Sequence, residues 1–191
     1  MPPLEVTSVN VARVESRVID GRRVRTAIGK RPVAARLAVR RLGLEGDEQA
    51  ESSLHGGLTK AVYAYPALHY PFWQTVRAQA RAALWDDTLP PGAMGENLTL
   101  AGLDETMLWI GDRLVLPGCV LAVSEPRMPC FKFGAAMGFA QAVKLMAQSG
   151  FCGAYLAVIE EGDVGAGDAV TLQPGPREVN LRELFRARTG G

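Results

Sequence analysis

Short segments with the hydrophobic pattern of β-strands recur along the whole chain, separated by glycine and proline, and this pattern most limits the possible folds. The segments expected to be strands are residues 4–14, 33–42, 60–66, 96–103, 106–126, 154–161 and 168–174. Within residues 33–42, for example, apolar and arginine side chains alternate, as in a strand with one buried face. Glycine–aspartate and proline–glycine turns at residues 111–112 and 117–118 divide the longest of these segments.

Fewer segments have helical spacing. Helices are expected over residues 72–84, from Ala135 to Gln148 with Ser149 and Gly150 at the C-cap, and over residues 180–189. Many short strands with few helices favour a mainly β fold, a closed or nearly closed β-barrel with peripheral α-helices, over a sheet of βαβ units. The barrel domain is predicted to span residues 1–175, followed by a short helical tail over residues 176–191.

Composition and charge exclude several classes of protein. The 191 residues are 48% hydrophobic and 21% charged, as in ordinary globular proteins. The formal net charge of +1 gives no indication of a nucleic acid polymer or an anionic membrane as partner. No apolar run approaches the roughly 20 residues that span a bilayer, and the N-terminal MPPLEVTSVN lacks a signal-peptide pattern. With three cysteines, an odd number, these features predict a cytoplasmic protein with reduced thiols.

The segment EPRMPCFKFG, residues 125–134, contains the cysteine that is the strongest candidate for a functional thiol. Two prolines stiffen the loop, so Cys130 is expected at its end, immediately before a helix. A helix N-terminus and the neighbouring cations Arg127 and Lys132 favour a thiolate, which is a nucleophile or a soft metal ligand. The alternative is a buried thiol with a purely structural role.

The other cysteines and the two histidines carry weaker signals. Cys119 falls in an apolar strand segment and is expected in the core, whereas the role of Cys152 is open. A zinc site is disfavoured because the cysteines are 11 and 22 positions apart and only His55 and His69 could add ligands. A dyad of Cys130 with His55 is possible, but no cysteine-protease signature accompanies it. His69 is expected to be packed or partly exposed.

A glycine pair in the segment SLHGGLTKAVY has the character of an anion-binding loop. Gly56 and Gly57 can adopt conformations that aim backbone N–H groups at an anion, and Lys60 follows closely. The spacing is not that of a P-loop. The alternative is an ordinary glycine turn with a solvated lysine.

Three further polar segments admit both functional and structural interpretations. In RTAIGKRPV, Thr26 and Lys30 could bind an anion or belong to an exposed basic loop. In MGENLTL, Asn97 and Thr99 could offer polar groups to a ligand, although a turn there needs no function. The acidic residues 43–51 favour a solvated loop with one structural aspartate over carboxylate catalysis.

Taken together, these segments resemble one family. LEGDEQAE, HGGLTKAVYAYP, HYPFW, GENLTLAGLDE, WIGDRLVLPG and LAVSEPRMPCFKF occur in the order found in the MOSC domain, the C-terminal domain of molybdenum cofactor sulfurase. The resemblance runs from about Arg25 to Leu172, and within the family it is greatest to stand-alone bacterial proteins that confer resistance to 6-N-hydroxylaminopurine. It implies a β-barrel that holds the molybdenum cofactor, a pterin-dithiolene with a phosphate, in a positively lined cleft.

The resemblance also implies roles for individual residues. Cys130 becomes the ligand to molybdenum and tunes the metal, and Arg127 stabilises the oxygen that leaves the substrate. The expected cofactor contacts are Thr26, Lys30, His55, Gly56, Gly57, Lys60, Asn97 and Arg127. The implied activity is reduction of small N-hydroxylated bases and similar N–O compounds by a monomer or homodimer, with electrons from a separate flavoprotein or reductase. Two alternatives stay open: a sulfur carrier with a persulfide on Cys130, and a non-catalytic carrier of the cofactor.

Overall fold

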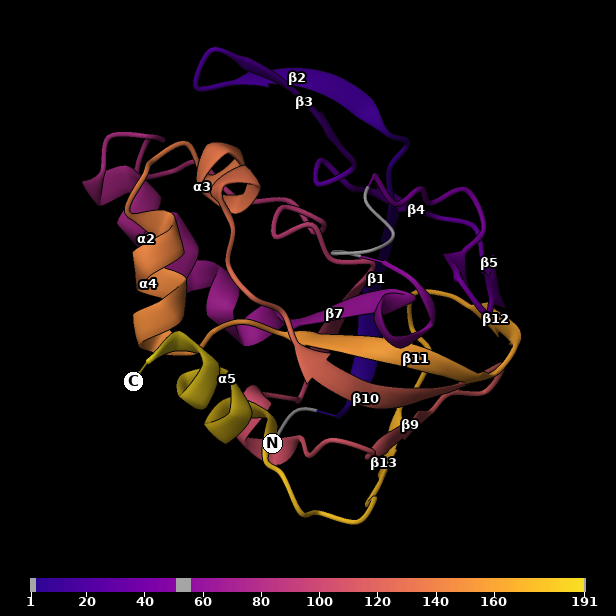
Figure 1. The fold of residues 1–191 in the computed structure, drawn as a ribbon. Coiled ribbons are helices and arrows are strands. Elements are labelled where there is room, and N and C mark those ends of the chain that lie inside the picture. The colour runs from indigo at the N-terminus through magenta and orange to yellow at the C-terminus, as the bar shows by residue number, and fades with distance from the viewer. Residues whose placement is uncertain (1–2, 51–55, 191) are drawn as a thin grey trace.

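The computed structural model describes residues 3–50 and 56–190, and its largest element is an eight-stranded sheet (Figure 1). Its strands are β1 (Glu5–Val11), β4 (Arg31–Val33), β7 (Val62–Pro66), β8 (Leu98–Ala101), β9 (Arg113–Val115), β10 (Val120–Pro126), β11 (Ala154–Glu160) and β13 (Thr171–Gln173). Their order across the sheet is β13-β9-β10-β11-β7-β8-β1-β4. Neighbours are antiparallel except β7 and β8, which are parallel. The prediction of a mainly β fold with few helices is confirmed.

Closure into a barrel is not found in the part of the chain that the structure describes, which corrects the sequence-based expectation. The sheet curls far enough that the amide of Val6 donates to the carbonyl of Asp168 at 2.9 Å and that of Val170 to Leu4 at 2.9 Å. The other end of β1 pairs with β4 instead. Because the outer edge of β1 is divided between these two segments, no single strand closes the ring.

Two smaller sheets flank the large one. The first has the order β12 (Gly162–Val164), β5 (Leu37–Arg40), β6 (Gly43–Leu44). The second is a hairpin of β2 (Glu15–Ile19) and β3 (Arg22–Thr26), which stands away from the main sheet in Figure 1. The sequence analysis assigned no strand to this hairpin.

Four α-helices gather at one side of the main sheet (Figure 1): α2 (Tyr70–Gln79), α3 (Phe131–Met137), α4 (Ala142–Ser149) and α5 (Leu181–Thr189). The single helix expected from Ala135 to Gln148 is wrong, because Gly138 takes the left-handed conformation with φ 81° and ends α3. Gly150 caps the C-terminus of α4 as predicted. The predicted C-terminal helix is confirmed by α5, although the expected domain boundary at residue 175 stays a prediction. Within the described residues, no helix is long and apolar enough to cross a membrane.

The buried apolar side chains form two clusters, and the second one fixes the helix that follows Cys130. The first fills the curl of the sheet, with Leu121 and Leu156 fully buried. The second packs the helices together and includes Trp73 from α2 and Phe133 from α3, whose rings meet edge to face at 5.1 Å. Each large apolar side chain buried in this way contributes about 1.5–3 kcal/mol, so α3 is held firmly against the body of the protein.

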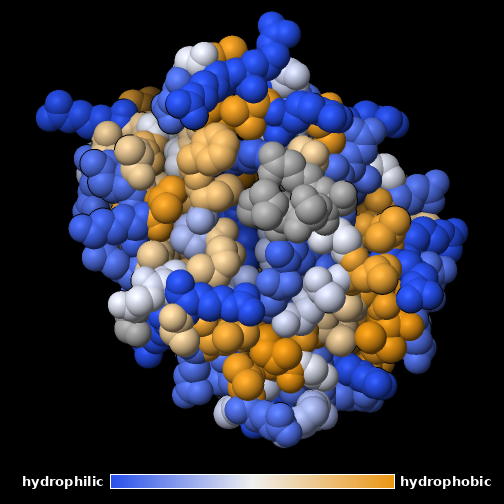
Figure 2. Space-filling view, in the orientation of Figure 1, coloured by the Kyte–Doolittle hydropathy of each residue, from blue (hydrophilic) through white to orange (hydrophobic). Residues whose placement is uncertain are grey.

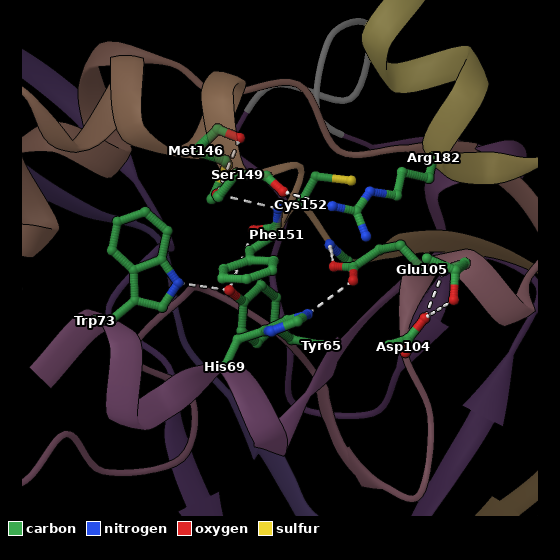
Figure 3. A network of polar contacts seen from close by, with 12 residues as sticks. Tyr65, His69, Trp73, Asp104, Glu105, Met146, Ser149, Phe151, Cys152 and Arg182 are labelled. Atoms are coloured by element: carbon green, nitrogen blue, oxygen red, sulfur yellow. Dashed lines mark hydrogen bonds and ion pairs between the residues drawn. The ribbon is translucent and has the colours of Figure 1, made fainter.

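His69 belongs to a buried polar network near the start of α2 (Figure 3). Its Nε2 lies 2.7 Å from a carboxylate oxygen of Glu105, and its ring stacks on Phe151 at 3.8 Å. The other carboxylate oxygen of Glu105 accepts from the backbone amide of Gly153 at 2.8 Å. Of the two expected states of His69, packed or partly exposed, the structure shows the packed one. The network joins α2 to the loop before β11.

Candidate functional site

An open pocket of about 630 Å³, measured to include its mouth, lies between the end of β3, strands β7 and β11, and the loop that joins β10 to α3. Its walls include Thr26, Ile28, Lys30, Glu48, Lys60, Tyr63, Gly95, Asn97, Arg127, Cys130, Lys132 and Tyr155. Segments distant in sequence thus meet at one cavity.

Cys130 reaches this pocket from the position immediately before α3, as predicted. Its carbonyl accepts a hydrogen bond from the amide of Phe133 at 3.0 Å and so begins the helix. Cys130 is half-buried, whereas Cys119 and Cys152 are buried in the core. Burial raises the pKa of Cys119 to about 11 and that of Cys152 well above its ordinary value. Of the three thiols, Cys130 is therefore the one placed for chemistry.

Arg127 is a buried cation beside that thiol. Its side chain lies between the rings of Tyr63 and Phe133, with the guanidinium carbon 5.3 and 5.2 Å from their centroids. Burial acts to lower the pKa of Arg127, but Tyr63, Tyr155 and Cys130 outweigh this effect and raise it. No carboxylate of the described residues forms an ion pair with Arg127, so its charge is available to a bound anion.

Lys30 and Asn97 line the same pocket but are held by Asp47. The Lys30 ammonium lies 2.5 Å from one carboxylate oxygen of Asp47, and both side chains are nearly inaccessible. The Asn97 amide nitrogen donates to the other oxygen at 2.8 Å, while its carbonyl oxygen accepts from the amide of Tyr63 at 3.0 Å. Asp47 is the structural aspartate that the acidic segment was expected to hold. This network ties the loop of residues 27–30 to the start of β8.

Three further predicted residues can be placed. Thr26 ends β3, and its hydroxyl oxygen accepts from the amide of Ile28 at 3.2 Å. Lys60 lies over the ring of Tyr155 at 5.7 Å and 3.7 Å from a carboxylate oxygen of Glu125. These residues extend the polar lining of the pocket from the end of β3 toward Tyr155 in β11. Lys132, which was named only as a cation near the thiol, also lines the pocket and is buried.

The glycine pair lies beside the pocket and outside its described lining. Gly57 has φ 86°, a left-handed conformation that glycine adopts without strain, and its amide donates to the side-chain oxygen of Gln49 at 3.0 Å. Gly56 is buried. His55 lies outside the described residues. The cofactor contacts expected of these three residues stay predictions.

The aromatic wall was missed by the sequence analysis. Tyr63 in β7 and Tyr155 in β11 are directly paired in the antiparallel register, and their rings lie 5.4 Å apart. Burial raises the pKa of Tyr155, and its hydroxyl is hydrogen bonded to Arg127. Two tyrosines in separate predicted strands were a signal for this wall, but which strands are neighbours could not be known.

Glu96 holds the turn that carries Gly95, another residue of the pocket lining. It is fully buried and accepts hydrogen bonds from the amides of Gly92 at 2.8 Å and Met94 at 3.1 Å. Burial raises the pKa of Glu96 despite these donors. The turn that it holds carries Gly95, where a β-carbon would come within 2.8 Å of Ile28. A larger residue there would force the Ile28 side chain, which also lines the pocket, to shift.

The fold and site together define a sheet-rich domain with a cationic pocket that contains one thiol. The chain matches the model of the family described as "MOSC domain" over residues 51–171, and it belongs to that family. This confirms the resemblance drawn from the sequence.

Relatives cover most of the chain. It is 40% identical to "Uncharacterized protein YflK" of Bacillus subtilis, over 87% of this chain and 72% of that protein. It is 35% identical to "Protein YiiM" of Escherichia coli, over 83% of this chain and 68% of that one. The crystal structure of YiiM from Geobacillus stearothermophilus superposes with a TM-score of 0.76 at 29% identity, covering 98% of this chain and 84% of that one. A longer relative named "Reductase", from Gibberella moniliformis, is 31% identical over 97% of this chain but only 33% of its own length.

Proposed function

We propose that the pocket binds the molybdenum cofactor and that the protein uses it to reduce N-hydroxylated bases or related N–O compounds. Electrons are supplied by a separate flavoprotein or reductase. The observation that carries the proposal is one wall of the pocket, where the half-buried thiol of Cys130 lies alongside the buried cations Arg127 and Lys132. The name of the fungal relative, "Reductase", supports a reductive activity.

The residues of this wall fit the cofactor chemically. A thiolate is the kind of soft ligand that suits molybdenum, and the two cations suit the phosphate of the pterin. Arg127 supports this fit most directly, because it is a buried charge without a carboxylate partner in the described part of the chain. When bound, the cofactor supplies a metal that accepts two electrons and passes them to an N–O bond.

The overall reaction defines what the side chains must do. Breaking one N–O bond and releasing its oxygen as water consumes two electrons and two protons and leaves an amine N–H bond. The guanidinium of Arg127 can donate hydrogen bonds to the departing oxygen and stabilise its negative charge. The Tyr155 hydroxyl, which is hydrogen bonded to Arg127, holds a proton within the pocket. Cys130 holds and tunes the metal.

The same wall also supports two other activities. A thiolate near cations is a good nucleophile, so Cys130 could carry a persulfide and donate its sulfur. The pocket could equally hold the cofactor for transfer to another protein without turnover. The three functions differ in whether the purified protein contains molybdenum and whether it reduces a substrate.

The test uses the wild type, Cys130→Ala and the control variant Cys119→Ala, all purified from a host that makes the cofactor. Each is supplied with chemically reduced methyl viologen and an N-hydroxylated purine, and the amine product is quantified by chromatography. The proposal predicts turnover by the wild type and Cys119→Ala and a loss of at least about 100-fold in Cys130→Ala. Full turnover by Cys130→Ala would remove Cys130 from the mechanism. Bound molybdenum without turnover would indicate a carrier, and cyanide-labile sulfur on Cys130 without molybdenum would indicate the persulfide function.

A further inference from the structure

Charge is unevenly distributed along the chain. Residues 13–41 contain nine arginines and one lysine against two carboxylates, a net charge of +8, so the rest of the chain carries −7. The net charge of +1 conceals this separation. A concentrated positive surface attracts acidic partners over distances of about a Debye length, whatever the total charge of the protein.

Four of the nine arginines lie on the β2–β3 hairpin, which also carries both carboxylates of the segment, Glu15 and Asp20. Arg22, Arg23 and Arg25 are exposed, and none forms an ion pair with a described residue. Arg17 is the exception, since it pairs with Glu15. Figure 2 shows hydrophilic side chains projecting at the top of the molecule, where Figure 1 places the hairpin.

The register of the hairpin separates its two faces. Val18 is directly opposite Arg23, and Ser16 is opposite Arg25, so these four side chains share one face. Ile19, one residue further along, is buried and belongs to the inner face. The outer face therefore presents two arginines and Val18, which is 73% exposed. Arginines around an exposed apolar side chain are typical of protein interfaces.

The hairpin that carries this outer face borders the proposed site through residues of its inner face. Thr26, the last residue of β3, lines the cofactor pocket. At the other end of the hairpin, Ile19 and Asp20 border a second hollow of about 760 Å³ together with Phe131 and other residues of α3 and the segment that follows it. Phe131 directly follows Cys130 and is 54% exposed. A protein seated on the outer face would thus lie over the hairpin that borders both hollows.

We propose that the outer face of the β2–β3 hairpin is the docking surface for an acidic electron-carrier protein with a flavin or an iron–sulfur cluster. The inference rests on the proposed function, which requires two electrons per N-hydroxyl group reduced. The carrier gives up those two electrons and is oxidised, solvent supplies two protons, and the oxygen leaves as water. Complementary charge accelerates the encounter, and the exposed Val18 supplies apolar contact once the partner is seated.

The experiment compares two pairs of charge reversals in the cofactor-loaded protein. Arg23→Glu/Arg25→Glu changes the outer face, while Arg113→Glu/Arg186→Glu makes the same change in charge at exposed positions of β9 and α5. Turnover of an N-hydroxylated purine is measured with reduced flavodoxin, an acidic flavoprotein, and separately with reduced methyl viologen, which needs no protein docking. Binding of flavodoxin to each variant is measured by fluorescence anisotropy at low and high salt.

We expect Arg23→Glu/Arg25→Glu to lose at least about tenfold in kcat/KM with flavodoxin at low salt and to keep its rate with viologen. The control pair should match the wild type with both donors, and added salt should weaken flavodoxin binding to the wild type. The proposed docking surface is wrong if the wild type does not bind flavodoxin. It is also wrong if Arg23→Glu/Arg25→Glu binds flavodoxin as well as the wild type does. Preferential binding of a DNA oligonucleotide to this face overturns it in favour of nucleic acid. Absence of viologen-driven turnover in the wild type instead overturns the proposed function, because binding is measured independently.

Discussion

Replacing Arg127 with methionine removes a buried charge while roughly keeping the side-chain volume. The variant loses two ring contacts, each worth up to about 2 kcal/mol when desolvated, and a hydrogen bond to Tyr155 worth about 1 kcal/mol. The substitution also removes the desolvation cost of the buried charge, which is several kcal/mol because no described carboxylate compensates that charge. These opposing effects nearly cancel. We therefore expect the free energy of unfolding of Arg127→Met to stay within about 2 kcal/mol of the wild type.

Anion binding should respond much more strongly than stability. Phosphate at ten times its dissociation constant should stabilise the wild type by about 1.4 kcal/mol, which corresponds to a rise in Tm of about 3–6 °C. Arg127→Met should show little or no rise, because the buried cation that faces the pocket is gone. Urea denaturation gives the free energies of unfolding, and thermal denaturation with and without phosphate gives the shifts in Tm.

Arg182→Met is the matched control, because Arg182 is a half-buried arginine outside the described pocket lining. It should keep the full response to phosphate. An equal rise in Tm for Arg127→Met and the wild type would refute the assignment of Arg127 to anion binding. A loss of about 3–5 kcal/mol in the free energy of unfolding would refute the charge argument, because that cost is typical of a broken buried ion pair.

Two further predictions concern groups with shifted pKa values. At neutral pH, iodoacetamide should label Cys130 in the folded protein and spare Cys119 and Cys152, whose pKa values burial raises; peptide mass spectrometry that finds all three equally labelled would contradict this. A hydrogen bond from Arg36 lowers the pKa of Asp168, so the stabilisation is full above the unfolded-state pKa of about 3.9 and is lost as the pH falls through the lower folded-state value. Asp168→Asn should accordingly be less stable than the wild type at pH 7, and the two should converge in acid; a constant difference in urea denaturation across that range would exclude this linkage.

The position of Cys130 before a helix could be predicted from the sequence because its cues are local. Prolines, neighbouring cations and the start of a helix all lie within residues 125–134, and Cys130 was placed at the end of its loop correctly. The β2–β3 hairpin was missed although Asp20 and Gly21 form an Asp–Gly turn, with φ values of 48° and 73°. Its strands carry arginines where most strands carry apolar residues, so the alternation on which the prediction relied is weak.

Other features depend on contacts between distant segments. The break at Gly138 follows from a left-handed φ that a helical hydrophobic pattern does not reveal. The sheet stays open because the outer edge of β1 pairs with β4 at one end and with residues 168–170 at the other. This division depends on how far the sheet curls, which local sequence patterns do not reveal. The pairing of Lys30 with Asp47 joins residues 17 positions apart across a loop, so it could not be predicted from local pattern.

The central claim is that Cys130 holds molybdenum in this pocket, and elemental analysis tests it most directly. Wild type, Cys130→Ala and Cys119→Ala are expressed side by side in a host shown to make the cofactor, and molybdenum is measured per chain. We predict about one atom per chain in the wild type and Cys119→Ala, and much less in Cys130→Ala. Equal molybdenum in all three proteins, or none in the wild type, would contradict the account.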